Sequence, residues 1–207
     1  MTHRRIMFLG MAAAALLLLM GWLWLKPTGG DAFAQCRRGA VAGGAGALGA
    51  PFTLTSETGE RVTDAQVFAK PSLLYMGYTF CPDVCPLDNA RNAAAADLLD
   101  GKGIEVTPVF MTVDPRRDTP EQLAQFTDAM HPRMIGLTGS DEEIRQAAKA
   151  WRFYFKLNDE TDKENYLVDH MTTTFLVLPG HGTVDFFGRD VTAEEMADRV
   201  ACFVERM

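Results

Sequence analysis

Two cysteines, Cys81 and Cys85, lie in the stretch TFCPDVCP (79–86), between an apolar strand pattern and an alanine-rich helix pattern. A thiolate is a nucleophile and a ligand for soft metals, and a helix N-terminus favours its negative charge. The spacing is one residue longer than the Cys-x-x-Cys of thiol redox motifs. The wider gap suits a metal ion better than an unstrained disulfide, and two inert buried thiols or a structural disulfide are the alternative.

Among the histidines, His170 is the one that the order of elements places near this cysteine pair. It stands where a polar loop ends and the strand pattern of Met171–Leu178 begins. In a layered α/β sheet that point lies near the N-terminus of the helix after Cys85, so we expect the imidazole to reach the two sulfurs. The other histidines, which we interpret as solvated or capping residues, are His3, His131 and His181.

The first fifty residues differ in character from the rest of the chain. Ile6–Leu25 carries no charged residue, and a helix of that length at about 1.5 Å per residue spans roughly 30 Å, the thickness of a bilayer's hydrocarbon core. We predict an uncleaved membrane anchor, a single transmembrane helix, over residues 1–26, with a cleaved signal peptide as the alternative. The Gly- and Ala-rich residues 27–50 then form a flexible tether that reaches about 27 Å.

This anchor also predicts where the rest of the chain lies. Because the segment before the apolar run is short, we expect the N-terminus on the cytoplasmic side of the membrane and the C-terminal domain on the opposite side. We find no arginine-rich transit peptide in the sequence, which favours a bacterial inner membrane with the domain facing the periplasm. The formal net charge of −7 argues against nucleic acid as a partner.

Residues 51–207 alternate strand and helix patterns, which predicts one mixed α/β domain with a thioredoxin-like sheet and helices on both faces. Two apolar segments have the pattern of strands buried on both faces. The predicted strands are Phe52–Thr55, Arg61–Thr63, Ser72–Tyr78, Val106–Val113, Met134–Thr138, Met171–Leu178 and Thr183–Gly188. The predicted helices are Leu87–Leu99 with Pro86 at its first position, Thr119 to about Met130, Ser140 to about Trp151, and Thr192 to about Glu205.

Three stretches of this domain resemble the Sco (SenC) family, membrane-tethered copper chaperones for cytochrome c oxidase. They are YTFCPDVCP (78–86), TVDPRRDTP (112–120) and YLVDH (166–170), and FGRD (187–190) is similar to the family's closing segment. The resemblance covers the whole domain and implies copper ligands at Cys81, Cys85 and His170. It also implies a recipient, the dinuclear copper site in the copper-bearing subunit of cytochrome c oxidase, and other copper chaperones as further partners.

The chemistry of these three residues agrees with that implication. Two thiolates and one imidazole suit Cu(I) in a trigonal site and hold Cu(II) with an added weak ligand, whereas zinc usually takes a fourth ligand. Met171 stands where the family commonly has serine; we predict that it faces away from the metal, because neighbours in a strand point to opposite faces. We predict that Asp114 and Asp118 brace their loop rather than bind metal.

The two remaining cysteines, Cys36 and Cys202, are far apart in the sequence. Cys202 lies off the apolar stripe of the last predicted helix, so we expect it to be accessible. Cys36 falls in the predicted tether. An oxidising compartment permits a disulfide that fastens the tether to the domain, and two free thiols are the alternative.

The leading hypothesis is a copper-binding assembly factor, rather than an enzyme, that delivers copper by ligand exchange. The alternative is a thiol-disulfide reductase in which Cys81 and Cys85 keep the oxidase's copper-binding cysteines reduced. His170 separates the two, because copper binding needs it and a reductase does not. A redox or copper sensor is a third hypothesis. Peroxidase activity is not predicted, because the motif lacks the Thr-x-x-Cys context of peroxiredoxins.

Overall fold

The computed structural model describes residues 16–17, 20, 32–38, 48–159, 161–162 and 165–207. The chain divides into two compact units, Met1–Ala34 and Gln35–Met207. Most of the predicted anchor and tether fall outside the described residues. Within the part of the chain that is described, no helix is long and apolar enough to cross a membrane.

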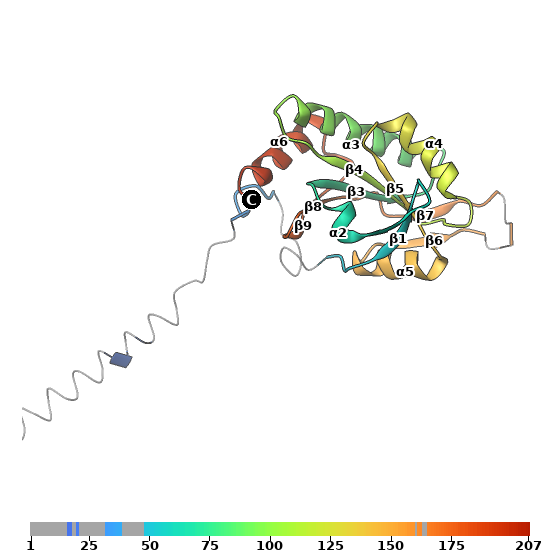
Figure 1. Cartoon of the computed structure of the whole chain (residues 1–207), viewed down its shortest axis with the longest axis horizontal. Coiled ribbons are helices and arrows are strands. Elements are labelled where there is room, and N and C mark those ends of the chain that lie inside the picture. The colour runs from blue at the N-terminus through green and yellow to red at the C-terminus, as the bar shows by residue number, and fades with distance from the viewer. Residues whose placement is uncertain (1–15, 18–19, 21–31, 39–47, 160, 163–164) are drawn as a thin grey trace, which may run out of the picture. The chain divides into compact units, whose positions relative to one another are not determined.

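A seven-stranded mixed sheet forms the centre of the second unit (Figure 1), in the order β2-β1-β5-β4-β3-β8-β9. Strands β3, β4 and β5 are parallel, and β1, β2, β8 and β9 are antiparallel to their neighbours. The strands are β1 (Thr53–Ser56), β2 (Arg61–Thr63), β3 (Ser72–Gly77), β4 (Thr107–Thr112), β5 (Ile135–Thr138), β8 (Thr174–Leu178) and β9 (Gly182–Phe187). Every residue of β3 and β4 is buried, as their apolar sequences predict.

Helices cover both faces of this sheet, as predicted from the sequence. In Figure 1, α3, α4 and α6 lie on one face, and α2 and α5 lie on the other. The helices are α2 (Asp64–Val67), α3 (Val84–Asp100), α4 (Pro120–Met130), α5 (Asp141–Ala150) and α6 (Ala193–Val204). The Ala-rich sequence of α3 matters here, because buried Ala93, Ala95 and Ala96 leave space for close packing against its neighbours.

One part of the predicted sheet is wrong. The sequence pattern places His170 at the start of a strand running from Met171, but β8 begins only at Thr174. His170 instead ends β7 (Val168–His170), which pairs with β6 (Phe155–Leu157) in a separate two-stranded sheet. The strands of this pair are too short for a clear sequence pattern.

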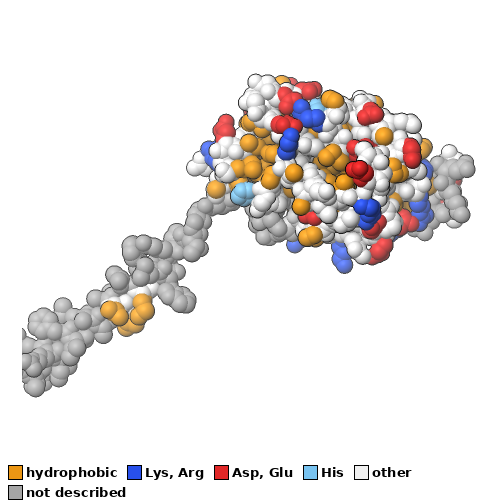
Figure 2. Space-filling view, viewed as in Figure 1, with side chains coloured by type: hydrophobic (Ala, Val, Ile, Leu, Met, Phe, Trp, Pro, Cys, Tyr) orange, Lys and Arg blue, Asp and Glu red, His pale blue; other side chains and the backbone are white. Residues whose placement is uncertain are grey.

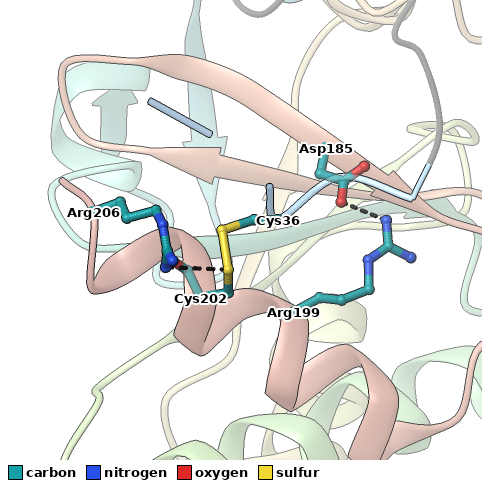
Figure 3. Close-up of a disulfide and its surroundings, with 5 residues drawn as sticks. All are labelled: Cys36, Asp185, Arg199, Cys202 and Arg206. Carbon is teal, nitrogen blue, oxygen red and sulfur yellow. Dashed lines mark hydrogen bonds and ion pairs between the residues drawn. A yellow bond between two sulfur atoms is a disulfide. The ribbon is translucent and has the colours of Figure 1, made fainter. Parts of the chain in front are cut away.

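Of the two alternatives that the sequence leaves open for Cys36 and Cys202, the structure has the disulfide, which joins residues 166 positions apart. Figure 3 shows the bond beside the last turn of α6, where the Arg206 guanidinium donates to the Cys202 sulfur over 3.3 Å. Two arginines next to Cys36 add to this attachment: Arg37 donates to the Val184 carbonyl of β9, and Arg38 pairs with Glu195 of α6. The segment after Gln35 is therefore fastened to one corner of the domain.

Replacing both Cys36 and Cys202 with serine is expected to lower the free energy of unfolding by about 2–4 kcal/mol, because the disulfide closes a very long loop in the unfolded chain. Urea denaturation of the double variant and of the oxidised wild type measures this difference. Unreduced, metal-free wild type should show free thiols only at Cys81 and Cys85. Equal stability of the two proteins, or four titratable thiols, would contradict the prediction.

The start of α5 predicts a pH dependence of stability. Ser140 and Glu143 form the capping box that the sequence indicates, and Arg61 donates to Glu143 over 2.5 Å. This hydrogen bond from Arg61, with a further one from the Ser140 backbone, lowers the pKa of Glu143 to about 2. Since the folded pKa is depressed, the stabilisation is complete above the unfolded pKa of about 4.3 and is lost as pH falls toward 2.

We therefore expect Glu143→Gln to lower the free energy of unfolding by about 1 kcal/mol at pH 7, because solvent screens this half-exposed pair. The deficit should shrink between pH 4.5 and pH 2, which denaturation at several pH values measures. Gln146→Glu, one turn further along α5, adds one negative charge to the same helix. It is the control for a change of helix charge that does not involve the capping box. A deficit that stays constant down to pH 2 would show that Glu143 acts through packing alone.

Candidate metal centre

Cys81, Cys85 and His170 come together at one end of the sheet. Cys81 lies in the turn that follows β3, Cys85 in the first turn of α3, and His170 at the end of β7. Their ligand atoms lie within 4.8 Å of one another, and 3.3 Å separates Cys85 Sγ from His170 Nε2. Two segments that are 85 positions apart in the sequence, the stretch with both cysteines and the end of β7, thus form one compact donor set.

The beginning of α3 explains how the two cysteines are arranged. The helix begins at Val84, so Cys85 is its second residue and Pro86 its third, which corrects the prediction of Pro86 as the first. The side chain of Asp83 does not cap the helix. Instead the Cys85 N–H points at Cys81 Sγ over 3.5 Å. A sulfur thus takes the place of a capping oxygen.

Burial and hydrogen bonding fix the state of His170. Burial lowers the pKa of His170, so its ring is neutral near pH 7. Its Nδ1 lies 2.7 Å from the carbonyl oxygen of Met171. Because a carbonyl only accepts, Nδ1 carries the proton and donates it, which leaves the lone pair on Nε2 facing Cys85. The ring is therefore in the tautomer that binds a metal through Nε2.

Aromatic rings hold the imidazole in this orientation. Tyr75 and Tyr78 meet it edge to face, with ring centroids 6.3 Å and 5.7 Å away, and Phe153 lies nearly parallel to it at 6.3 Å. The surrounding apolar wall also excludes water: Cys85 is fully buried, and burial raises the pKa of its thiol well above the usual range. A bound cation would offset this cost by stabilising the thiolate.

Gly77, the last residue of β3, makes room for the Cys85 sulfur. A Cβ atom at this position would lie 2.7 Å from Cys85 Sγ and 2.9 Å from a ring carbon of Tyr75. Both distances are far below van der Waals contact. The sequence pattern offers no sign of this requirement, because the glycine stands in an otherwise ordinary apolar strand.

Asp118 and Asp114 brace the loops around the cysteines, as predicted. Asp118 accepts hydrogen bonds from the backbone and side chain of Thr79 and from the Thr112 hydroxyl, over 2.6–3.0 Å. Burial raises the pKa of Asp118, and these hydrogen bonds oppose that shift. Asp114 pairs with Arg117 over 2.6 Å, and the Arg117 guanidinium stacks 3.6 Å from the centre of the Tyr166 ring. These contacts tie the segment before Cys81 to the one before His170.

Met171 does not join the donor set. Its thioether accepts the Tyr154 N–H over 3.3 Å on the surface of the domain. The prediction that it faces away from the metal is consistent with this contact. The reason given for it does not hold, since β7 ends at His170 and strand alternation does not extend to Met171.

The described residues contain a second group of the right composition, Asp97, Asp100 and His131. The hydrogen bonds of His131 argue against metal binding there. Its Nδ1 accepts the Arg133 N–H over 3.1 Å, so Nε2 carries the proton and faces Asp97. Arg133 in turn pairs with Asp100. This group is therefore a satisfied hydrogen-bond network, whereas the lone pair on Nε2 of His170 is directed at the Cys85 sulfur, a second potential metal ligand.

The donor set at Cys81, Cys85 and His170 fits a soft metal ion. Two thiols and one imidazole with a fixed tautomer are the ligands that copper prefers. Among the described residues, no fourth His, Cys, Asp or Glu side chain joins this group, as a structural zinc site would require. Both cysteines are free thiols, so they are available as ligands.

Comparison with known proteins agrees with these features. A family model described as SCO1/SenC matches residues 41–205. Protein SenC of Rhodobacter capsulatus is 51% identical over 199 residues, which cover 95% of this chain and 89% of that protein. The mitochondrial SCO1 homolog 1 of Arabidopsis thaliana is 40% identical over 158 residues, 76% of this chain, and the chain spans only 47% of that protein's length.

A solved structure also matches. The crystal structure of Arabidopsis thaliana ScoI with copper bound has a TM-score of 0.72 and 38% sequence identity, and the match covers 77% of this chain and 99% of that chain. The thioredoxin-like mixed α/β fold predicted from the sequence is thereby confirmed. On these matches in sequence and fold, the chain is a member of the SCO1/SenC family.

Proposed function

We propose that the domain binds one copper ion through Cys81, Cys85 and His170 and passes it on during the assembly of cytochrome c oxidase. The observation that carries this proposal is the donor set itself: Nε2 of His170, with its lone pair fixed, lies 3.3 Å from Cys85 Sγ, and Cys81 lies beside both. A related protein of the same fold has been crystallised with copper bound. Copper is the cargo of this site.

The burial of the ligands suggests how copper leaves the site. Cys85 is fully buried, whereas Cys81 keeps 8% of its surface exposed and His170 is half-buried. An incoming ligand therefore reaches the copper first on the side of Cys81 and His170. Stepwise exchange of thiolate for thiolate keeps the ion coordinated throughout, so it is never released to water.

The destination follows from the family resemblance of the sequence motifs. We propose the dinuclear copper site of the oxidase's copper-bearing subunit as the acceptor. Figure 2 shows acidic and basic side chains interspersed over the visible face of the domain, so no continuous basic stripe runs across this face. A mixed surface of this kind suits transient docking to another protein better than binding to nucleic acid.

For the location we propose a bacterial inner membrane, with the domain on the periplasmic side. The support is the uncharged run Ile6–Leu25 and the disulfide, which persists in an oxidising compartment. The disulfide attaches Cys36 to α6. The proposed tether between the anchor and the domain therefore ends at Cys36 and not at residue 50.

Copper transfer to the acceptor tests this function. The anaerobic, reduced protein is loaded with one equivalent of Cu(I) and mixed with the apo copper-bearing domain of the oxidase subunit, whose ligand cysteines are reduced. We expect the copper to move to the acceptor, which separation of the two proteins and metal analysis measure. Copper that stays on the donor under all conditions would contradict delivery.

The reductase hypothesis remains the second candidate, because Cys81 and Cys85 are adjacent free thiols. It predicts a different result in the same system. Metal-free protein mixed with an acceptor whose cysteines form a disulfide would reduce that disulfide, and His170→Ala would retain this activity. Reduction without copper transfer would favour the reductase.

A further inference from the structure

A buried carboxylate lies directly behind the metal centre and takes no part in it as a ligand. Asp88 is one helical turn after Cys85 on α3, and only 4% of its surface is exposed. Its two oxygens have different partners: the Tyr75 hydroxyl donates to Oδ2 over 3.0 Å, and Arg189 Nε faces Oδ1 at 3.2 Å. Burying a carboxylate is costly, so its position beside the metal ligands calls for an explanation.

Tyr75 connects this carboxylate to the metal ligands. Its side chain is fully buried, and the same missing Cβ of Gly77 that makes room for Cys85 Sγ also makes room for the Tyr75 ring. The ring meets His170 edge to face and borders the same space beside Gly77 as the Cys85 sulfur, while the hydroxyl donates to Asp88. One tyrosine therefore lies against two of the three ligands and the carboxylate.

From this arrangement we infer that Asp88 is a positioning residue of the copper site: it holds the Tyr75 hydroxyl beside Cys85, and its charge, offset by Arg189, sets the preference of the site between Cu(I) and Cu(II). The inference rests on the proposed copper binding by Cys81, Cys85 and His170. Asp88 acts through its neighbours, and it does not touch the metal.

The electrostatic part of this inference has a definite sign. Cu(II) carries one more positive charge than Cu(I), so a nearby negative charge stabilises Cu(II) more. Asp88 lies close enough to act on the ligands, because Tyr75, which donates to its Oδ2, meets the His170 ring edge to face. The positive charge of Arg189, which faces Asp88 Oδ1, weakens the effect of the Asp88 charge on the metal site. The other charged groups that interact with this network are Arg91, whose guanidinium is held by the backbone carbonyls of Gly188 and Val191, Asp190, and Asp169 beside His170.

Two opposite substitutions test the electrostatic effect. Asp88→Asn keeps the shape of the side chain and removes the negative charge, so the ratio of Cu(II) to Cu(I) affinity should fall by about tenfold, as expected for one unit charge acting across a partly buried distance. Arg189→Gln leaves Asp88 uncompensated, so the ratio should rise. Competition titrations with chelators specific for each oxidation state measure both affinities on the full chain.

Tyr75→Phe tests the positioning effect. It removes only the hydroxyl, and we expect the thiolate-to-Cu(II) absorption band to shift while one copper is still bound. Asp97→Asn on the exposed side of α3 is the control, and it should leave the band and the affinity ratio unchanged. Circular dichroism and thermal unfolding check that each variant is folded.

The outcomes separate this inference from the proposed function. If the wild type binds no copper, the proposed function fails. If the wild type binds one equivalent, and Asp88→Asn and Arg189→Gln shift the affinity ratio in the same direction or not at all, Asp88 serves only the packing of α3 and the inference is overturned. Opposite shifts, together with a changed band in Tyr75→Phe, support it.

Discussion

Replacing His170 with alanine is expected to weaken copper binding by more than about 100-fold, beyond the effect of removing an outer hydrogen-bond partner of a metal ligand. The imidazole is one of three donor groups, and its Nε2 is held toward Cys85 by the hydrogen bond from Nδ1 to the Met171 carbonyl. Without it, two thiolates remain, and the cavity left among Tyr75, Tyr78 and Phe153 offers no replacement donor.

Anaerobic competition of the reduced protein with a Cu(I) chelator measures this loss. The matched control is His181→Ala, because His181 lies in the turn between β8 and β9 and is exposed. The control should bind copper as the wild type does. An unchanged copper affinity of His170→Ala would show that the imidazole is not a copper ligand. Continued reduction of disulfides by this variant would then favour a reductase.

Gly77→Ala is expected to disrupt the site without touching a ligand. The added methyl group would lie 2.7 Å from Cys85 Sγ and 2.9 Å from the Tyr75 ring, and both neighbours are fully buried with little room to move. Overpacking of this kind costs about 1–3 kcal/mol of stability. Because the sulfur is the nearest atom, it must be displaced, which changes its separation from His170 and lowers copper affinity.

Urea denaturation and copper competition on the same preparation measure the two effects of Gly77→Ala. Gly101→Ala is the control, since Gly101 has a helical backbone and a Cβ there would meet its nearest neighbour at an ordinary 3.4 Å. The control should change neither property appreciably. Wild-type copper affinity in Gly77→Ala would mean that the sulfur accommodates the methyl group and that the site is less rigid than its packing indicates.

The comparison of sequence and structure separates what local patterns encode from what packing decides. Caps and apolar runs are local, so the start of α4 at Pro120, with Thr119 as its cap, and that of α5 after Ser140 were predictable. The pairing of β6 with β7 was not predictable, because strands of only three residues lack a distinct period. As a result His170 was expected at the beginning of a strand and instead lies at the end of one.

The sequence by itself identified the candidate donor groups, because residue types and motif spacing are read directly from it. These groups are two thiols four positions apart and one histidine after a polar loop. The tertiary structure alone decided their immediate environment. The tautomer of His170 follows from the local backbone geometry that places the Met171 carbonyl at Nδ1. The space that Gly77 leaves for the Cys85 sulfur and the hydrogen bond from Tyr75 to Asp88 join residues from different elements. Such contacts depend on distances of a few ångströms between distant segments, which no local pattern specifies.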